Sequence, residues 1–341
     1  MENNLSTSSF NSPANHLRSS LVFLGAFLIL LFVADRIIGF SLDHLYRQLK
    51  VGTMVSGKLN RVVISDEPYD LFILGSSRAD HHVIPDSLLP FNAFNLGIGG
   101  AGIAYTECVA SILNQYGKKP EVLLLHLDEK DFLVDPKHEE RFGGVSTLGY
   151  YYGKNEVTTG YLKSATDYPR LKYAFKTFRY NGRFIDLLKD YYVSTSKNTQ
   201  HYDGFDPIAP TSMDSVKTLF SANTDRKIDS TKVISATAIT ALDNLIAASK
   251  TNGTALVCFS APVFEGRIND YYKGDYGPVK AQLHQKLKEA GVPYLDYSGS
   301  QLPGDLASPS LWKDATHLNV SGARRFSSRL RKDLFVVLNN Q

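Results

Sequence analysis

The stretch Asp70-Leu-Phe-Ile-Leu-Gly-Ser-Ser-Arg78 decides the fold of this 341-residue chain. Residues 70–74 form a short, largely apolar run that ends at Gly75, as is typical of a buried strand followed by a tight turn. A continuous apolar run, unlike an alternating one, predicts a strand that is covered on both faces, as in a parallel sheet. The Gly-Ser-Ser-Arg segment would then lie directly beyond the end of that strand.

Strand and helix patterns alternate on the C-terminal side of this stretch. The strongest strand pattern is Glu-Val-Leu-Leu-Leu-His-Leu at residues 121–127. Other strands are predicted at 93–96, 254–259 and 293–296, and helices at 103–116, 230–251, 279–290 and 321–338. This alternation predicts a mainly parallel sheet with helices on both faces, which is a three-layer α/β/α sandwich. We assign residues 69–341 to this domain.

The alternation breaks between about residues 135 and 230, which we interpret as an insertion into the α/β domain. This segment is rich in Tyr, Asp, Lys and Asn, and it contains 10 of the 19 tyrosines of the chain. Tyrosine combines an apolar ring with a hydroxyl, which suits a groove for sugar rings. The plainer interpretation, which we favour, is that these tyrosines pack a segment that is short of aliphatic residues.

The N-terminal region is typical of a membrane anchor. Residues 1–20 are polar and predict a flexible tail, whereas residues 21–40 are apolar except for Asp35 and Arg36. A membrane span needs about 20 apolar residues, and the two charges are tolerated if they lie near the interface. Residues 21–40 are therefore predicted to be a transmembrane helix, followed by a partly helical connector at 41–68.

Two other interpretations of this apolar run are less favourable. A cleaved signal peptide would need a site with small residues, and none is well placed; no lipobox cysteine follows either. A buried helix of a soluble protein is the weaker interpretation, because the run is apolar on all faces and lies at the chain terminus. We therefore expect an uncleaved signal anchor. Arg18 precedes the span and Arg36, Arg47 and Lys50 follow it, which counts mildly against a cytoplasmic N-terminus.

The composition excludes several classes of protein. The chain has 37 Lys and Arg against 34 Asp and Glu, so its net charge of +3 indicates no nucleic-acid partner. Its only cysteines, Cys108 and Cys258, exclude a disulfide scaffold and a cysteine-based zinc cluster, and Cys258 is expected in the core. A hydrophobic content of 43% is enough for a full core and excludes a disordered chain. We expect no cofactor and no metal.

Three segments contain the residue types of a serine acyl-transfer site. They are Gly-Ser-Ser-Arg at 75–78, Asn-Leu-Gly-Ile-Gly-Gly-Ala-Gly at 95–102 and Asp-Ala-Thr-His-Leu-Asn-Val-Ser-Gly at 314–322. A serine needs a base, which His317 would supply to Ser77, and Asp314 would orient the imidazole. Glycine-rich backbone can direct N–H groups at an oxyanion. The segment 95–102 could instead cradle a phosphate, although it fits a dinucleotide fingerprint poorly.

These segments resemble the conserved blocks of the SGNH (GDSL-like) hydrolase and acyltransferase superfamily. The first block is matched by Gly75-Ser76-Ser77, the second by Asn95 through Gly100, and the last by Asp314, His317, Leu318-Asn319 and Gly322-Ala323. The resemblance covers about residues 69–133 and 231–338. It implies a flavodoxin-like α/β/α fold, a Ser77–His317–Asp314 triad, and an oxyanion hole formed by the N–H groups of Ser77 and Gly100.

The chain departs from this pattern at two positions. Ser76 stands where the superfamily has Asp, as in its membrane-anchored envelope members with a Gly-Ser-Ser block. Lys130, in Asp128-Glu129-Lys130-Asp131, falls where the superfamily has an oxyanion asparagine. Lysine could still act as a cationic donor, and the loss of one oxyanion donor typically lowers the rate by about 10²- to 10³-fold.

Other polar residues near these blocks are candidates for substrate contacts. Arg78, Asn95 and Asp131 are assigned this role, although for Arg78 a structural ion pair is the more common alternative. His81 and His82 are expected in a loop or at the rim of a pocket, because no further ligands for a metal ion can be placed beside them.

The function expected from these features is a serine esterase or O-acyltransferase that acts on cell-envelope polysaccharide, with O-acetyl as the favoured acyl group. The resemblance and the anchor together imply a single-pass protein of the bacterial inner membrane, with its catalytic domain on the periplasmic, extracytoplasmic side. One alternative is a non-catalytic glycan-binding or assembly subunit of an envelope complex, for which Lys130 is the motivation. Another is a lipid esterase at the membrane surface.

Overall fold

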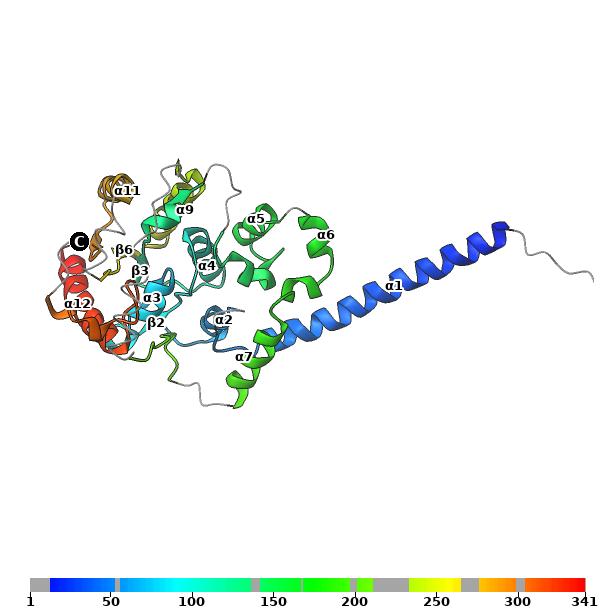
Figure 1. The fold of residues 1–341 in the computed structure, drawn as a ribbon, viewed down its shortest axis with the longest axis horizontal. Coiled ribbons are helices and arrows are strands. Elements are labelled where there is room, and N and C mark those ends of the chain that lie inside the picture. The colour runs from blue at the N-terminus through cyan, green and yellow to red at the C-terminus, as the bar shows by residue number, and fades with distance from the viewer. Residues whose placement is uncertain are drawn as a thin grey trace, which may run out of the picture.

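A computed structural model describes residues 13–52, 56–135, 142–166, 168–196, 201–210, 233–264, 276–298 and 304–340 (Figure 1). The first twelve residues of the predicted tail lie outside these ranges. So do parts of the predicted insertion (136–141, 167, 197–200 and 211–230) and the first three residues of the helix predicted at 230–251.

The fold is α/β, built on a five-stranded sheet with the strand order β2-β1-β3-β6-β7. The strands are β1 (Leu71–Leu74), β2 (Ala93–Asn95), β3 (Val122–His126), β6 (Ala255–Ser260) and β7 (Tyr294–Asp296). Every neighbouring pair is parallel, and Leu71 of β1 pairs with Ala93 of β2 and Val122 of β3. All five strands lie within one or two residues of their predicted positions, so the prediction of a mainly parallel sheet is confirmed.

Both faces of the sheet are buried, because successive strand side chains pack into two separate apolar cores. Phe72 and Leu74 point into one core, and Leu71 and Ile73 point into the other. The first core is covered by α4 (Ile103–Gln115), α9 (Ala236–Asn252) and α11 (Tyr276–Ala290). The second is covered by α3 (Ser77–His82) and α12 (Val320–Asn339). This arrangement explains why the strands are apolar at consecutive positions.

The sequence pattern did not predict one short sheet, the short helix α3 or the helices of the insertion. Strands β4 (Leu133–Val134) and β5 (Val233–Ile234) form an antiparallel pair, and the helix predicted from residue 230 begins only at Ala236. Ser235 caps that helix, because its hydroxyl accepts a hydrogen bond from the Ala238 N–H at 2.9 Å. Two-residue strands are too short to show a period, and α3 was interpreted as a turn because of its Gly-Ser-Ser start.

The N-terminal helix α1 (Pro13–Tyr46) is longer than the predicted span of 21–40 at both ends. Residues 13–20, predicted as flexible tail, are helical, and so is the first part of the predicted connector, up to Tyr46. The part from Leu17 to Tyr46 is long and apolar enough to cross a membrane. Most of its side chains are exposed, but Leu42 and Tyr46 belong to the core of the α/β domain.

The connector is a structural part of the domain. It contains α2 (Gly57–Ile64), as the prediction of a partly helical segment required. Asn60 of α2 donates hydrogen bonds from its amide nitrogen to the carbonyls of Tyr46 (2.9 Å) and Leu49 (2.8 Å). These bonds satisfy carbonyl groups at and just beyond the C-terminal end of α1 and so fix the helix to the domain.

The insertion forms a cluster of short helices next to α1 (Figure 1). They are η3 (Val145–Tyr151), α5 (Glu156–Ser164), α6 (Pro169–Ala174), η4 (Thr177–Tyr180) and α7 (Phe184–Ser196). Outside the insertion, the described residues also form the 3-10 helices η1 (Pro85–Leu88), η2 (Glu129–Phe132), η5 (Gly304–Leu306) and η6 (Pro309–Leu311). Tyr152 stacks on Tyr173 with ring centroids 3.9 Å apart, and Tyr150 stacks on Tyr46 of α1 at 4.2 Å. These tyrosines therefore pack the insertion, as the plainer interpretation predicted.

A buried ion pair joins three strand ends. The Arg78 guanidinium of α3 lies 2.7 Å from the carboxylate of Asp128, which follows β3, and it also donates to the carbonyl of Ala261 beyond β6 at 3.4 Å. Burial would raise the pKa of Asp128, but the charges of Arg78 and Lys130 outweigh it and hold that pKa well below its ordinary value. Both side chains of the pair are almost fully buried.

Replacement of Asp128 by Asn is expected to lower the free energy of unfolding by about 3–5 kcal/mol at pH 7, because it leaves the Arg78 charge buried without a partner. The folded-state pKa of Asp128 is depressed, so its stabilisation is complete above about pH 4 and is lost as the pH falls below this value. The difference in free energy of unfolding between the parent chain and Asp128→Asn should therefore become smaller as the pH falls below about 4. Denaturant unfolding of the full chain in detergent, followed by the fluorescence of its single tryptophan, Trp312, measures both effects.

The matched control is Asp243→Asn, which removes an exposed ion pair with Lys286 (2.6 Å). Exposed pairs of this kind contribute less than about 1 kcal/mol. Equal destabilisation by the two variants would contradict a structural role for the Arg78–Asp128 pair.

Candidate active site

Ser77 lies at the point where β1 turns into α3. Gly75 has φ of 140°, and a Cβ atom there would lie only 2.6 Å from the Cβ of His126, so both the backbone angle and the close packing require glycine. Ser77 is the first residue of α3 and is half-buried. Strand β1 lies between β2 and β3, where the strand order reverses, and in open parallel sheets ligands bind beyond the carboxyl ends of the strands at this point.

The structure brings Ser77, His317 and Asp314 together, although Ser77 and His317 are 240 residues apart. The Ser77 Oγ lies 2.9 Å from His317 Nε2, and His317 Nδ1 lies 3.0 Å from each oxygen of the Asp314 carboxylate. Because an ionised carboxylate can only accept, it assigns the ring proton to Nδ1 and leaves the Nε2 lone pair directed at the serine hydroxyl. This is the arrangement that activates a serine as a nucleophile.

Asp314 is held in its ionised form. Partial burial would raise its pKa, but the hydrogen bond and charge of His317 and the backbone N–H of Thr316 outweigh burial and lower the pKa of Asp314 to about 2. Its Oδ1 also accepts from the backbone N–H groups of Thr316 (2.8 Å) and His317 (2.9 Å). The carboxylate thus fixes both the imidazole ring and the loop from which the ring projects.

His82 contacts the backbone of the loop that contains His317. It is fully buried in α3, and its Nε2 accepts a hydrogen bond from the backbone N–H of Leu318 at 3.0 Å. Burial, together with the nearby His317 and Arg78, lowers the pKa of His82 well below its usual value, so the ring is neutral and can accept. The prediction that His82 lies in a loop or at a pocket rim is wrong. A helical interpretation of residues 77–82 would have placed His82 three residues after Ala79, on the buried face.

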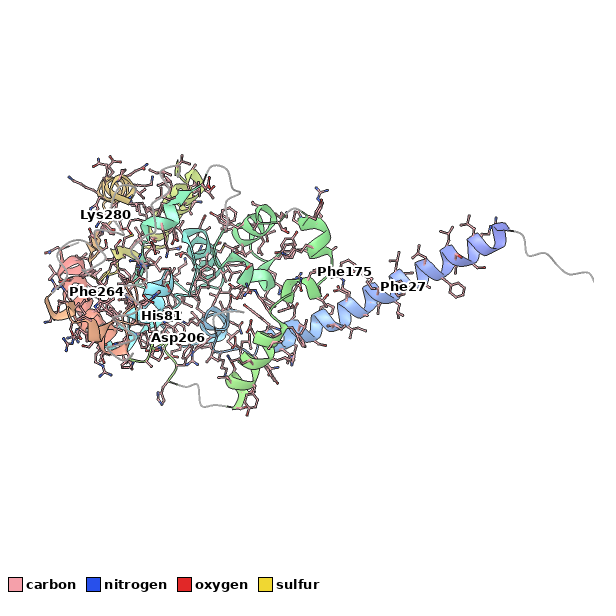
Figure 2. All side chains as sticks on the ribbon, in the orientation of Figure 1. Phe27, His81, Phe175, Asp206, Phe264 and Lys280 are labelled. Atoms are coloured by element: carbon pink, nitrogen blue, oxygen red, sulfur yellow. The ribbon has the colours of Figure 1, made fainter. Side chains whose placement is uncertain are left out.

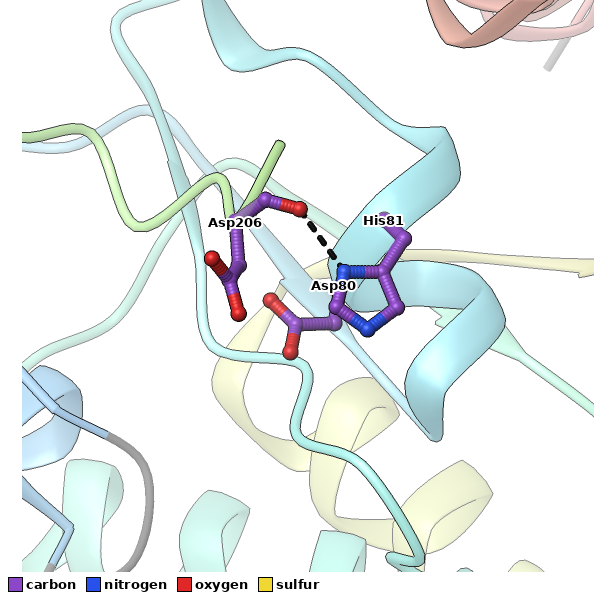
Figure 3. Close-up of side chains that lie close together, drawn as sticks. All are labelled: Asp80, His81 and Asp206. Atoms are coloured by element: carbon purple, nitrogen blue, oxygen red, sulfur yellow. Dashed lines mark hydrogen bonds between the residues drawn. The ribbon is translucent and has the colours of Figure 1, made fainter. Parts of the chain in front are cut away.

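His81 lies beside the triad. Its ring is 5.9 Å from the ring of His317, and its Nδ1 donates to the carbonyl of Asp206 at 2.7 Å (Figure 3). Asp80, His81 and Asp206 each have a ligand atom within 4.8 Å of the others, a spacing that could hold a metal ion. The ammonium of Lys58 already lies 2.5 Å from the Asp80 carboxylate and occupies the position of a cation there. We therefore assign no metal to this cluster.

The segment 201–210 of the insertion contacts the site, which the sequence did not indicate. The Asp203 carbonyl accepts a hydrogen bond from the N–H of Asn95 at 2.8 Å, and the Ile208 carbonyl accepts one from Val320 at 2.9 Å. A Cβ on Gly204 would lie 2.0 Å from the carbonyl oxygen of Asn95, so glycine is needed for this contact. The segment therefore links the end of β2 to the start of α12, beside the His317 loop.

The predicted oxyanion residues Gly100 and Lys130 share one cavity of about 170 Å³. Gly100 is exposed and has φ of 73°, whereas the half-exposed Lys130 has its ammonium 3.0 Å from Asp128. Among the described residues that line this cavity, neither Ser77 nor His317 occurs. The structure therefore joins Gly100 with Lys130, and Ser77 with His317, as two neighbouring groups at the same end of the sheet.

Two of the three predicted substrate contacts are corrected by the structure. Arg78 is buried in its ion pair with Asp128. Asn95 is fully buried, where it donates to the carbonyls of Ala79 and Val83 (both 2.8 Å) and accepts from the N–H of Gly97 (2.9 Å). Asn95 thus fixes α3 to the glycine loop, and Arg78 fixes α3 to the segments that follow β3 and β6.

Asp131 is the one predicted substrate contact that lines the cavity with Gly100. Burial and the neighbouring Asp128 raise the pKa of Asp131 well above its usual value, which favours its protonated form. A protonated carboxyl could donate a hydrogen bond into the cavity.

Comparison of the chain with models of known protein families and with curated proteins finds no match. Assignment of a reaction class therefore depends on the geometry of the Ser77–His317–Asp314 group.

Replacement of Asp314 by Asn is expected to slow the reaction of Ser77 with a fluorophosphonate by about 10³- to 10⁴-fold. An amide at this position no longer selects the Nδ1–H tautomer or offsets the imidazolium charge. The labelling rate of the full chain in detergent, read by in-gel fluorescence, measures the effect. Asp305→Asn, an exposed change outside the triad, is the control, and labelling of Asp314→Asn at the parent rate would contradict the assigned role.

Proposed function

We propose that this chain is a serine-dependent ester hydrolase or O-acyltransferase, with the three-layer α/β/α arrangement of the SGNH (GDSL-like) superfamily. The observation that supports this function is the hydrogen bond of 2.9 Å between Ser77 Oγ and His317 Nε2, with Asp314 bonded to the opposite ring nitrogen. The position of Ser77 beyond β1, at the reversal of strand order, is further support.

The reaction proceeds through an acyl-enzyme. Ser77 Oγ attacks the ester carbonyl while His317 Nε2 takes the hydroxyl proton, and Asp314 offsets the charge of the imidazolium. As the resemblance to the superfamily implies, we assign the oxyanion to the N–H groups of Ser77 and Gly100, and Gly100 lines the neighbouring cavity with Lys130. The ester C–O bond then breaks, and the leaving alcohol takes the proton from His317. Water or a sugar hydroxyl next attacks the acyl-enzyme while His317 takes its proton; the bond between the acyl carbon and Ser77 Oγ breaks, and His317 returns the proton to Ser77.

Cell-envelope polysaccharide, with O-acetyl as the favoured group, is the proposed substrate. A second hollow of about 630 Å³, lined in part by Tyr161 and Glu107, shares Phe142 and Thr237 with the Gly100 cavity. The two hollows therefore adjoin each other, as expected of sites for successive sugars of a chain. Tyr161 offers a ring of the kind that binds sugars, and its hydroxyl donates to the Glu107 carboxylate at 2.5 Å.

The proposed location is the bacterial inner membrane, with α1 as a single-pass anchor and the domain on the extracytoplasmic side. Figure 2 shows His81, which lies beside His317, in the part of the domain remote from Phe27 of α1. A site in this position faces a substrate outside the bilayer, which favours a polysaccharide over a membrane lipid.

A second candidate function is a non-catalytic glycan-binding or assembly subunit of an envelope complex. The observation that favours it is the contact of 3.0 Å between the Lys130 ammonium and Asp128, since a lysine bound in this way is a weaker oxyanion donor than the asparagine it replaces.

Replacement of Ser77 by Ala is expected to abolish fluorophosphonate labelling and to lower hydrolysis of p-nitrophenyl acetate by at least about 10⁴-fold, because the nucleophile is removed. The matched control is the adjacent variant Ser76→Ala. Its rates of fluorophosphonate labelling and of p-nitrophenyl acetate hydrolysis should stay within a few-fold of those of the parent chain. Persistent turnover by Ser77→Ala would exclude the proposed nucleophile. A parent chain that binds polysaccharide but neither labels nor hydrolyses the ester would select the second candidate.

A further inference from the structure

Helix α3 has two partly exposed side chains, Ser77 and His81. The other four residues of this short helix are buried. Residues that are four positions apart lie on the same face of a helix, so His81 lies one turn beyond Ser77 on the accessible face. The proposed acyl transfer uses Ser77 but gives no part to His81.

The imidazole of His81 also adjoins that of His317, which lies near the other end of the chain. The two ring centroids are 5.9 Å apart, and the ring planes are inclined by 74°. His317 Nε2 itself lies 2.9 Å from Ser77 Oγ. His81 therefore lies beside the ring that gives a proton to the leaving alcohol in the proposed reaction.

The segment 201–210 holds the His81 ring in one orientation. The carbonyl of Asp206 accepts a hydrogen bond from His81 Nδ1 at 2.7 Å (Figure 3), and the N–H of Asp206 donates to the carbonyl of Asp80 at 3.4 Å. Because a carbonyl can only accept, Nδ1 carries the ring proton, and Nε2 of the neutral ring is an acceptor. None of the described residues donates to this Nε2, so it is available to a ligand.

An ester of a sugar hydroxyl supplies a donor for this nitrogen. Its leaving oxygen has to lie within hydrogen-bond reach of His317 Nε2, and the hydroxyls on the neighbouring ring carbons lie next to that oxygen. Two hydrogen bonds of about 2.9 Å from adjacent oxygens can bridge two imidazoles whose centroids are 5.9 Å apart. An ester of a simple alcohol offers no such second donor.

We propose that His81 is a substrate-binding residue that selects esters of vicinal diols, the class to which partly acylated sugars belong. His81 Nε2 accepts a hydrogen bond from the hydroxyl next to the ester oxygen, while His317 Nε2 gives its proton to the ester oxygen itself. This inference rests on the proposed reaction of Ser77 and adds the class of alcohol that the site recognises.

The test compares two acetates that differ by one hydroxyl, trans-2-hydroxycyclohexyl acetate and cyclohexyl acetate, with the full chain in detergent. Release of acetate gives kcat/KM for each ester, and the rate of fluorophosphonate labelling reports on Ser77 and His317. His81→Asn keeps an N–H at the place of Nδ1, and with it the bond to Asp206, but has no acceptor at the place of Nε2. His81→Gln keeps a polar group at the place of Nε2. His284→Asn, at an exposed histidine of α11, is the matched control.

We expect the parent chain to prefer the hydroxy ester by at least about 5-fold in kcat/KM, which is the effect of one added hydrogen bond. His81→Asn should remove this preference, His81→Gln should keep part of it, and His284→Asn should keep all of it. A selective loss of this kind distinguishes a contact with substrate from a structural role, which would lower the rates for both esters alike.

Three results would overturn the inference. An equal fall in the rates for both esters and in labelling of His81→Asn would assign His81 to the support of His317. A preference that is absent from the parent chain, or unchanged in His81→Asn, would exclude the contact and leave the reaction of Ser77 intact. A parent chain that neither labels nor hydrolyses either ester would overturn the proposed reaction and this inference together.

Discussion

The buried ion pair between Arg78 and Asp128 is the contact on which the carboxyl end of the sheet, where Ser77 lies, depends. Arg78 directly follows Ser77, so its guanidinium fixes the first turn of α3 and thereby the direction of the serine hydroxyl. Asp128 follows β3, and the same guanidinium reaches a carbonyl beyond β6. A buried charge is tolerated only when it is paired, and this pair therefore holds the ends of β1, β3 and β6 in one relative position.

A different set of contacts holds the loop that contains His317 beside these strand ends. Its imidazole is fixed by Asp314, and its backbone is fixed by His82 through the N–H of Leu318. Because His82 lies five residues after Ser77 on the same short helix, α3 positions both Ser77 and the loop that contains His317. A displacement of α3 would move the two together, which preserves their hydrogen bond.

The insertion joins the membrane-type helix to the α/β domain. Tyr180 donates to Asp43 of α1 at 2.6 Å, and Thr177 and Lys176 hold Asp35. The tyrosines of this segment serve mainly as packing between α1 and the domain, which explains why a segment poor in aliphatic residues still forms a core. Helix α1 and the domain are therefore one continuous structure.

The sequence by itself predicted the five strands of the main sheet, the helices that cover it, the apolar N-terminal helix and the group Ser77, His317 and Asp314, which the structure brings together. These features follow from local periodicity and from short motifs, which depend only on neighbouring residues. The tertiary structure alone decided that Arg78, Asn95 and His82 are buried and bond to neighbouring segments of the fold. It also decided that β4 pairs with β5 and that α1 continues into the core. Each of these depends on contacts between residues far apart in the chain, and the burial of a polar side chain depends on whether such a distant partner satisfies its hydrogen bonds and charge.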